Sequence, residues 1–304
     1  MAQADDATAN HRWRSLSPPR PVLWVIGGTG EAVTLTTALA TEQIPCLVTV
    51  TTEAARRAYG ETPGLRVRVG ALAVDRLASF IQEQGIGAIL DASHPFAVEI
   101  SQAAIATAQA LGLPYWRYER PAVESVAEPD VADSTPLRLG ELIRYMPSLD
   151  HVLNEEILAG ERVLLTLGYR WLDQFRPWQD KATLFARILP SAVALAAALA
   201  AGFTPDRLIA LRPPVTAALE LALWQQWTIT TVITKASGQA GGEGVKRAVA
   251  QELGIPLVII SRPRLEYPAV SHSLETILAT CRGWGCAQTS PNKFSGQRII
   301  NPLE

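Results

Sequence analysis

A glycine-rich segment, Gly27–Ala32, carries the clearest chemical signal in the sequence. It lies between an apolar run, Val22–Ile26, that is typical of a buried strand and a stretch from Glu31 to Gln43 with helical character. Glycines let the backbone turn sharply and approach a diphosphate, while the free N–H groups at a helix N-terminus hold the anion. This order of elements favours a nucleotide site over a plain turn between strand and helix. The residues expected to bind the cofactor here are Gly27, Gly28, Thr29, Gly30, Glu31 and Ala32.

The loop departs from the common nucleotide motifs in two ways. Val33 occupies the third glycine position of the usual dinucleotide fingerprint. No Gly-Lys-Ser/Thr triplet follows, so the segment is not a P-loop. A dinucleotide remains the better interpretation because the glycines lie between a strand and a helix.

The end of the second apolar run, Cys46–Val50, indicates which dinucleotide would bind. An NAD site places a carboxylate there against the ribose 2′-hydroxyl, whereas an NADP site uses arginine and hydroxyl groups for the 2′-phosphate. Glu53 suits the first cofactor, and the neighbouring arginines favour the second. Two arginines on an exposed helix face would have the same spacing. The candidate contacts to a 2′-phosphate are Thr51, Thr52, Arg56 and Arg57.

A polar cluster, Asp91–Ala97, begins where another buried run ends. In an open α/β sheet, ligands bind outside the carboxyl ends of the strands. A lone histidine is more often structural, but His94 follows the polar residues Asp91 and Ser93. A further charged segment, Arg117–Pro121, follows the next strand. The residues of the cluster that we expect beside the cofactor are Ser93, His94, Pro95 and Phe96.

Short apolar runs alternate with longer amphipathic ones along the whole chain, which predicts parallel sheets covered by helices on both faces. The predicted strands are Val22–Ile26, Cys46–Val50, Arg66–Val69, Ala88–Leu90 and Pro114–Tyr118, then Arg162–Thr166, Leu184–Leu189, Arg207–Leu211, Thr230–Thr234 and Pro256–Ile260. An acidic stretch with little apolar periodicity, residues 122–136, is the predicted junction. We therefore expect an α/β protein with two Rossmann-like domains, mainly parallel sheets and a cleft between the domains. The predicted ranges are a flexible tail over 1–20, a dinucleotide-binding domain over 21–125, a second α/β domain with the substrate site over 126–283, and a tail over 284–304.

Length and composition narrow the class of protein. The 304 residues suggest about two domains, and 48% hydrophobic with 18% charged residues exclude disorder. Lys and Arg number 27 against 29 Asp and Glu, a balance that argues against nucleic acid as a partner. The three cysteines, Cys46, Cys281 and Cys286, are scattered, so we expect neither a disulfide framework nor a metal site. The N-terminal residues lack the apolar core of a signal peptide. The longest uncharged helical run is too short to span a bilayer. We therefore expect a soluble cytoplasmic protein without a membrane partner.

Six motifs in a fixed order resemble one known family. The first half contains Gly-Gly-Thr-x-Glu-Ala at 27–32, Asp-Ala-Ser-His-Pro-Phe-Ala at 91–97 and Arg-Tyr-Glu-Arg-Pro at 117–121. The second half contains Leu-Thr-Leu-Gly at 165–168, Thr-Lys-Ala-Ser-Gly at 234–238 and Ser-Arg-Pro at 261–263. Together they look like the precorrin-6A reductase family, which includes cobalt-precorrin-6A reductases of cobalamin biosynthesis. The resemblance covers residues 22–263.

The resemblance implies reduction of a double bond in the precorrin-6A macrocycle by hydride from NADPH or NADH. The first domain would hold the dinucleotide, and the carboxylate-rich tetrapyrrole would lie between the domains. A proton could come from His94, Lys235, the substrate or water, so no catalytic residue is assigned. Lys235 suits a carboxylate anchor better than a general acid. The candidates for binding the macrocycle are Arg120, Tyr169, Arg170, Arg187, Arg212, Lys235, Ser237 and Gly238.

Two stretches depart from the family's pattern, and some alternatives stay open. Arg212-Pro213-Pro214 stands where the family has a Gly-Pro-Phe turn, and the second strand lacks the family's Ser…Gly-Arg stretch. A short-chain dehydrogenase is excluded because no tyrosine has a lysine four residues on. A non-catalytic NADP-binding sensor is the alternative function, although it would not need the Lys-x-Ser-Gly cluster. The sequence does not distinguish the cobalt form from the metal-free macrocycle, NADPH from NADH, or a monomer from a homodimer.

Overall fold

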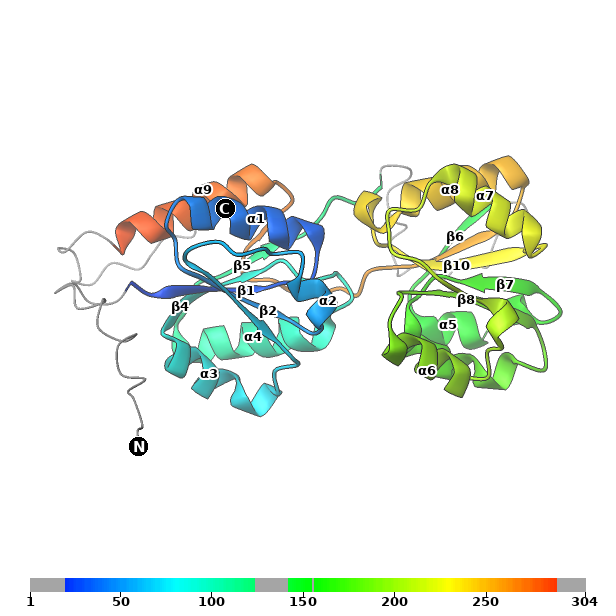
Figure 1. Ribbon diagram of the computed structural model, residues 1–304, viewed down its shortest axis with the longest axis horizontal. Coiled ribbons are helices and arrows are strands. Elements are labelled where there is room, and N and C mark those ends of the chain that lie inside the picture. The colour runs from blue at the N-terminus through cyan, green and yellow to red at the C-terminus, as the bar shows by residue number, and fades with distance from the viewer. Residues whose placement is uncertain (1–19, 124–141, 155, 289–304) are drawn as a thin grey trace, which may run out of the picture.

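The computed structural model describes residues 20–123, 142–154 and 156–288, and these form two α/β domains side by side (Figure 1). The sheet of the first domain has the order β12-β5-β4-β1-β2-β3, with every strand pair parallel. Strands β1 and β2 are buried along almost their whole length, as expected for a parallel sheet covered on both faces. The strands are β1 (Val22–Ile26), β2 (Cys46–Val50), β3 (Leu65–Val69), β4 (Ile86–Asp91), β5 (Tyr115–Tyr118) and β12 (Val270–Ser271).

Helices cover both faces of this first sheet. On one face, α1 (Gly30–Thr41) and α9 (Leu274–Ala287) pack on a core that includes Leu35 and Ile277. On the other, α3 (Leu77–Gln84) and α4 (Val98–Leu111) cover a second core around Trp24. The short helix α2 (Glu53–Arg56) follows β2.

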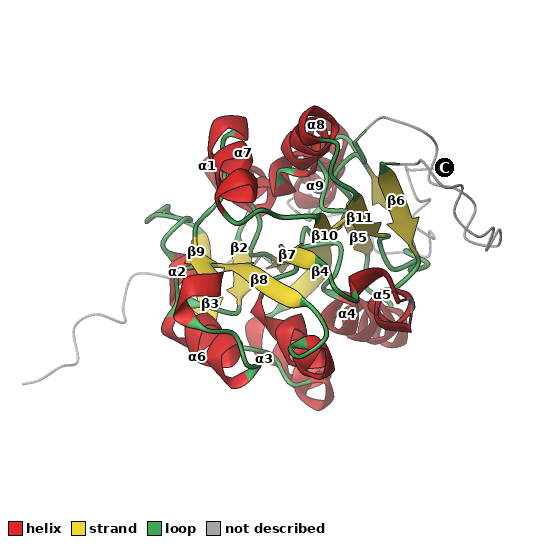
Figure 2. Ribbon diagram, turned by 90° about the vertical axis from the view of Figure 1, so that its right-hand side faces the viewer, coloured by secondary structure: helices red, strands yellow, loops and turns green. Residues whose placement is uncertain are grey.

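The second domain repeats this architecture with the strand order β6-β11-β10-β7-β8-β9, again all parallel. Viewed from this end, α7 and α8 lie on one side of the sheet and α5 and α6 on the other (Figure 2). The strands are β6 (Ile143–Met146), β7 (Arg162–Leu165), β8 (Thr183–Ile188), β9 (Leu208–Ala210), β10 (Thr231–Lys235) and β11 (Leu257–Ile260). The helices are α5 (Leu149–Asn154), α6 (Ala192–Ala200), α7 (Ala217–Gln226) and α8 (Glu243–Leu253).

The two Rossmann-like domains with parallel sheets are confirmed, but the predicted end of the second domain is wrong. Strand β12 pairs with β5, so that Val270 lies opposite Arg117 in the first sheet. Helix α9 then buries Ile277 and Cys281 in the first core. Residues 270–287 therefore belong to the first domain, instead of to a second domain ending at 283 and a tail from 284. Residues 1–19 of the predicted N-terminal tail, residues 289–304 of the predicted C-terminal tail and most of the predicted junction lie outside the described residues.

Both sheets reverse their winding at the centre, and the loops at these points carry the site. Neighbouring strands β1 and β4 lead to helices on opposite faces of the first sheet, and β7 and β10 do the same in the second. In doubly wound sheets this is where ligands bind. The carboxyl ends of the two sheets face each other, because the Phe96 ring after β4 lies 5.7 Å from the Trp171 ring after β7. Among the described residues, no helix is long and apolar enough to cross a membrane, and no three metal-ligating side chains gather.

Candidate active site

The glycine loop after β1 is held in shape by its own hydrogen bonds. Thr29 caps α1, since its Oγ1 accepts from the Ala32 N–H at 3.1 Å, and the same hydroxyl donates to the Ala92 carbonyl at 2.7 Å. Gly28 has a φ of 102°, a conformation that favours glycine, and its N–H donates to the Tyr59 hydroxyl at 3.0 Å. A Cβ on Gly28 or Gly30 would meet nothing within 4 Å, so the backbone is open to a ligand there. This open cradle at a helix N-terminus fits the diphosphate of a dinucleotide.

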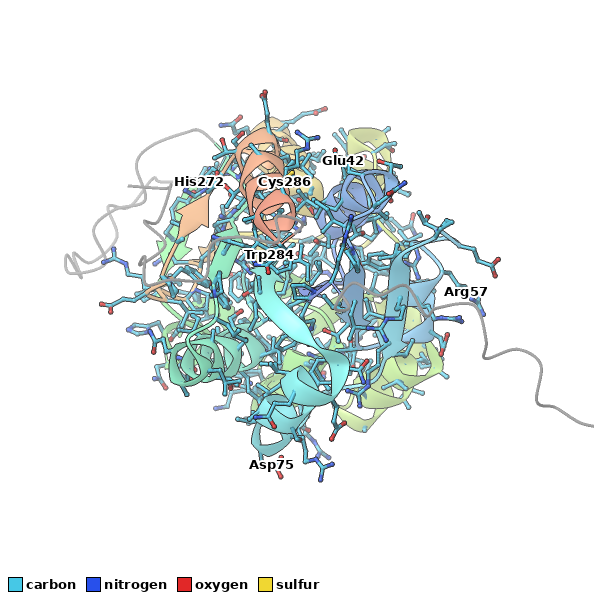
Figure 3. The ribbon with its side chains drawn as sticks, turned by 90° about the vertical axis from the view of Figure 1, so that its left-hand side faces the viewer. Glu42, Arg57, Asp75, His272, Trp284 and Cys286 are labelled. Atoms are coloured by element: carbon cyan, nitrogen blue, oxygen red, sulfur yellow. The ribbon has the colours of Figure 1, made fainter. Side chains whose placement is uncertain are left out.

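The residues after β2 lie at the edge of the first domain. Thr52 caps α2 by accepting from the Ala55 N–H at 3.1 Å. Arg56 is exposed, and its Nη1 lies 3.7 Å from Glu53 Oε2. Arg57 projects into solvent (Figure 3). Both the carboxylate for NADH and the arginines for NADPH are therefore present beside the strand end, and the choice between the cofactors stays a prediction.

Asp91 at the end of β4 organises the polar cluster rather than contacting solvent. Its buried carboxylate accepts from the Ser101 and Tyr115 hydroxyls, both at 2.6 Å, and from Arg117 Nη1 at 2.8 Å. The Ser93 N–H also donates to it at 2.9 Å, while the Ser93 Oγ accepts from Arg117 at 3.1 Å. These bonds fix the start of the loop that carries the next residues toward the second domain.

His94 is held as a neutral imidazole. Its Nδ1 accepts from the Phe96 N–H at 3.2 Å, which leaves the ring proton on Nε2. Burial, followed by the positive charges of Arg120 and Lys235, lowers the pKa of His94 to about 3. A neutral imidazole can donate a hydrogen bond but does not supply a proton at neutral pH. Protonated His94 is therefore not present at neutral pH, and the assignment of a proton donor stays a prediction.

Lys235 ends β10 and lies between aromatic rings from both domains. Its Nζ is 3.5 Å from the centroid of the Trp171 ring and 5.0 Å from that of Phe96. We call these two rings the aromatic cage. Burial, and next the positive charge of Arg170, lower the pKa of Lys235 to about 8. The ammonium is thus partly desolvated and titrates near neutrality, as is common for functional groups.

Arg120 joins the predicted cofactor and macrocycle regions. Its Nη2 lies 3.0 Å from a carboxylate oxygen of Glu31, the first-turn residue of α1, and its Nη1 donates to the Ser237 carbonyl at 3.2 Å. Gly238 follows with a φ of 69°, and a Cβ there would lie 2.9 Å from the Pro121 carbonyl. The loop after β10 is therefore in direct contact with the segment after β5.

The remaining predicted macrocycle residues lie less centrally. Tyr169 is half-buried against a core of the second domain, and exposed Arg170 lies over its ring at 5.9 Å from the ring centroid. Arg187 forms an ion pair with buried Glu220 of α7. Arg212 is exposed after β9, and within the described residues no hydrogen bond or ion pair joins it to the cluster around Lys235. A pocket of about 530 Å³ opens at the domain junction, lined by Pro95, Glu119 and residues 262–267.

Several residues of the site were missed from sequence. Trp171 forms half of the aromatic cage, yet only its neighbours Tyr169 and Arg170 were singled out. Tyr59 contacts the glycine loop from 31 positions away. Arg262 was noted only as part of a motif. Aromatic residues near a strand end were the available signal for Trp171, whereas the other two contacts require the fold.

The model of the family described as precorrin-6x reductase CbiJ/CobK matches residues 22–282. The chain belongs to the precorrin-6x reductase family. It is therefore an oxidoreductase of cobalamin biosynthesis, which supports the enzyme interpretation over the non-catalytic sensor.

Individual relatives agree with this assignment. A cobalt-precorrin-6A reductase from Synechocystis sp. is 44% identical over 86% of this chain and 95% of its own length. A precorrin-6A reductase from Rhodococcus erythropolis is 32% identical over 79% and 89%. A solved CobK precorrin-6A reductase has a TM-score of 0.67 at 24% identity, covering 89% of this chain and 98% of its own, and shows the shared fold.

Proposed function

We propose that this precorrin-6x reductase reduces a double bond in the cobalt-precorrin-6A macrocycle with hydride from NADPH. The observation that carries the proposal is the approach of Lys235 and Phe96, from opposite domains, at the ends of two facing sheets. The relative that is 44% identical is named a cobalt-precorrin-6A reductase, which supports the cobalt form of the substrate.

The first domain supplies a dinucleotide site in this proposal. The cradle of Gly28, Thr29 and Gly30 would hold the diphosphate, and Arg56 with Arg57 would bind the 2′-phosphate. Bound NADPH would supply the hydride, which is chemistry that belongs to the cofactor. Neutral His94 would donate a hydrogen bond from Nε2 and orient a ring placed beside it.

The second domain supplies the cation for the macrocycle. Lys235 is protonated below its pKa of about 8, so its ammonium can pair with a carboxylate of the substrate. The half-buried rings of Phe96 and Trp171 offer apolar surface for a flat macrocycle and exclude water from the space between the domains. Arg120 is already paired with Glu31 and would mainly hold the two regions together.

The test is an assay with purified protein, cobalt-precorrin-6A or metal-free precorrin-6A, and either NADPH or NADH. We expect fastest oxidation of NADPH with the cobalt macrocycle. Absence of oxidation in all four mixtures would refute the enzyme assignment, while a preference for the metal-free macrocycle would refute only the cobalt form.

The cofactor preference has its own test in the variant Arg56→Ala/Arg57→Ala. Each charge-assisted hydrogen bond to a phosphate contributes about 1.5–3 kcal/mol, so the Kd for NADPH should rise at least about tenfold. The Kd for NADH should stay unchanged, because that cofactor lacks the 2′-phosphate. If both dissociation constants change equally, or neither does, the assignment of the two arginines is wrong.

A further inference from the structure

One arginine outside the predicted site, Arg262, binds both domains at once. It follows β11, and its Nε donates to the Ala236 carbonyl of the second domain at 2.9 Å. Its Nη1 donates to the Glu119 carboxylate at 2.8 Å and to the Arg120 carbonyl at 2.7 Å, both in the segment after β5. Its Nη2 reaches the Pro121 carbonyl at 3.3 Å. The guanidinium of Arg262, which follows β11, thus forms hydrogen bonds to the segments that follow both β5 and β10.

The contact continues into the first domain through alternating charges. The Glu119 carboxylate accepts from Arg117 Nε at 2.9 Å and Nη2 at 2.7 Å, and Arg117 Nη1 donates to Asp91 at 2.8 Å. The Asp91 and Arg117 side chains are fully buried, and those of Glu119 and Arg262 are 13% and 14% exposed. We call Asp91, Arg117, Glu119 and Arg262 the interdomain charge chain. Its members are paired on both sides, which buried charges require.

The two ends of the interdomain charge chain lie beside the cofactor and macrocycle halves of the proposed site. Asp91 fixes the loop that leads to His94 and Phe96, and Ala236 is the residue next to Lys235. Gly238 makes the approach feasible, because a Cβ there would lie 3.1 Å from Arg262 Nη2. The position of Lys235 relative to the first domain is therefore coupled to the Arg262 contacts.

We propose that Arg262 is a positioning residue, which holds the Lys235 loop at the separation from the first domain that hydride transfer needs. A misplacement of reacting groups by about 1 Å can cost on the order of 10²-fold in rate. Arg262 would therefore affect turnover of the macrocycle without affecting the glycine loop. The proposal rests on the proposed function for its kinetic consequence, but its structural consequence can be measured independently.

The first test compares Arg262→Gln with Arg282→Gln. Arg282 donates from Nε and Nη2 to the Glu42 carboxylate, both at 2.6 Å, and Glu42 lies on the outer end of the first domain (Figure 3). We expect Arg262→Gln to lower kcat on the macrocycle on the order of 10- to 100-fold, with the Kd for NADPH within about threefold of the wild type. Arg282→Gln should change neither, and Arg262→Lys should recover only part of the rate because it lacks the planar fork. A rate for Arg262→Gln within twofold of wild type, or an equal loss of NADPH binding, would overturn the proposal.

A second readout does not depend on activity. Hydrogen exchange of the amides in residues 236–242 should accelerate in Arg262→Gln, while exchange in α6 stays unchanged. If the wild type oxidises neither cofactor yet this exchange accelerates, the proposed function fails and the structural role of Arg262 stands. If the wild type is active and neither exchange nor rate changes in the variant, the positioning role fails alone. If Arg262→Gln does not fold, Glu119→Gln provides a second test, because it removes one partner of the same contact. Glu119→Gln should show a smaller loss of kcat and a smaller acceleration of exchange in residues 236–242. Unchanged kcat and unchanged exchange in Glu119→Gln would overturn the proposal.

Discussion

At the scale of single residues, the sequence pointed to the chemistry but could not rank the groups that perform it. His94 and Lys235 were both named as candidate proton donors, because both lie in polar motifs at predicted strand ends, but Lys235 was expected to serve as a carboxylate anchor and no catalytic residue was assigned. Their protonation depends on burial and on charges far away in sequence, such as Arg120 beside His94 and Arg170 beside Lys235. In the structure, burial first and these charged neighbours second lower the pKa of His94 to about 3 and that of Lys235 to about 8.

The pH dependence of the reaction should report Lys235. Because its pKa is lowered to about 8, the ammonium is present below that pH and is lost above it. We expect kcat/KM for the macrocycle to fall as the pH rises through about 8, since kcat/KM reports ionisations of the free enzyme. Lys235→Arg should shift this alkaline limb to much higher pH, and Arg170→Ala should shift it upward by a smaller amount. An alkaline limb that stays in place in both variants would show that another group titrates.

His94 should influence the rate without shaping the pH profile. With a pKa of about 3 the imidazole is neutral over the whole physiological range. His94→Gln should lower kcat/KM by about 3- to 10-fold, as expected for the loss of one hydrogen bond of about 1 kcal/mol. The profile between about pH 5 and 8 should keep its form. A limb near the ordinary histidine pKa that disappears in His94→Gln would contradict the neutral assignment.

At the scale of elements, apolar periodicity in the sequence was sufficient to predict the central strands of each sheet. It was insufficient to predict the strands at the sheet edges. β1 and β2 are buried, mainly apolar runs, and β10 is buried over its first four residues, so all three were predictable. β6 is half-buried at a sheet edge and contains Arg144, and β12 has only two residues, so neither has a strand-like pattern. Helix α9 was not predicted. Its buried residues Ile277, Cys281 and Trp284 have helical spacing, but this spacing does not indicate which sheet the helix covers.

The glycine loop offers a matched test of packing. A Cβ on Gly27 would lie 2.4 Å from the Tyr59 hydroxyl oxygen and 2.7 Å from Val48 Cγ1. We expect Gly27→Ala to lower the free energy of unfolding by about 1–3 kcal/mol, the typical cost of overpacking. A Cβ on Gly283, at an exposed position of α9, would meet nothing within 4 Å, so Gly283→Ala should instead raise the free energy of unfolding by about 0.5–1 kcal/mol. Denaturant unfolding of the two variants measures both effects, and equal stability of Gly27→Ala and wild type would show that the loop is loosely packed.

At the scale of the whole molecule, the two-domain architecture could be predicted from the length of the chain and the alternation of strands and helices. The contacts between the two domains could not. The motifs Arg-Tyr-Glu-Arg-Pro and Ser-Arg-Pro look independent in the sequence. In the structure they bind each other, through Glu119 and Arg262, across 143 positions. Strand β12 likewise pairs with β5 of the first domain, although it follows the whole second domain in the sequence. Contacts over such separations depend on topology, which single-sequence periodicity does not encode.

These long-range contacts indicate that each domain contributes half of one site. The most direct measurement is NADPH oxidation by the wild type with cobalt-precorrin-6A, compared with Gly28→Ala in the first domain and Lys235→Met in the second. Alanine is strained at the φ of Gly28, and methionine lacks the ammonium of Lys235. We expect turnover by the wild type and a raised Kd for NADPH only in Gly28→Ala. In Lys235→Met we expect a raised KM or lowered kcat for the macrocycle with unchanged NADPH binding. NADPH binding that depends equally on both residues, or turnover that depends on neither, would contradict this division of the site between the domains.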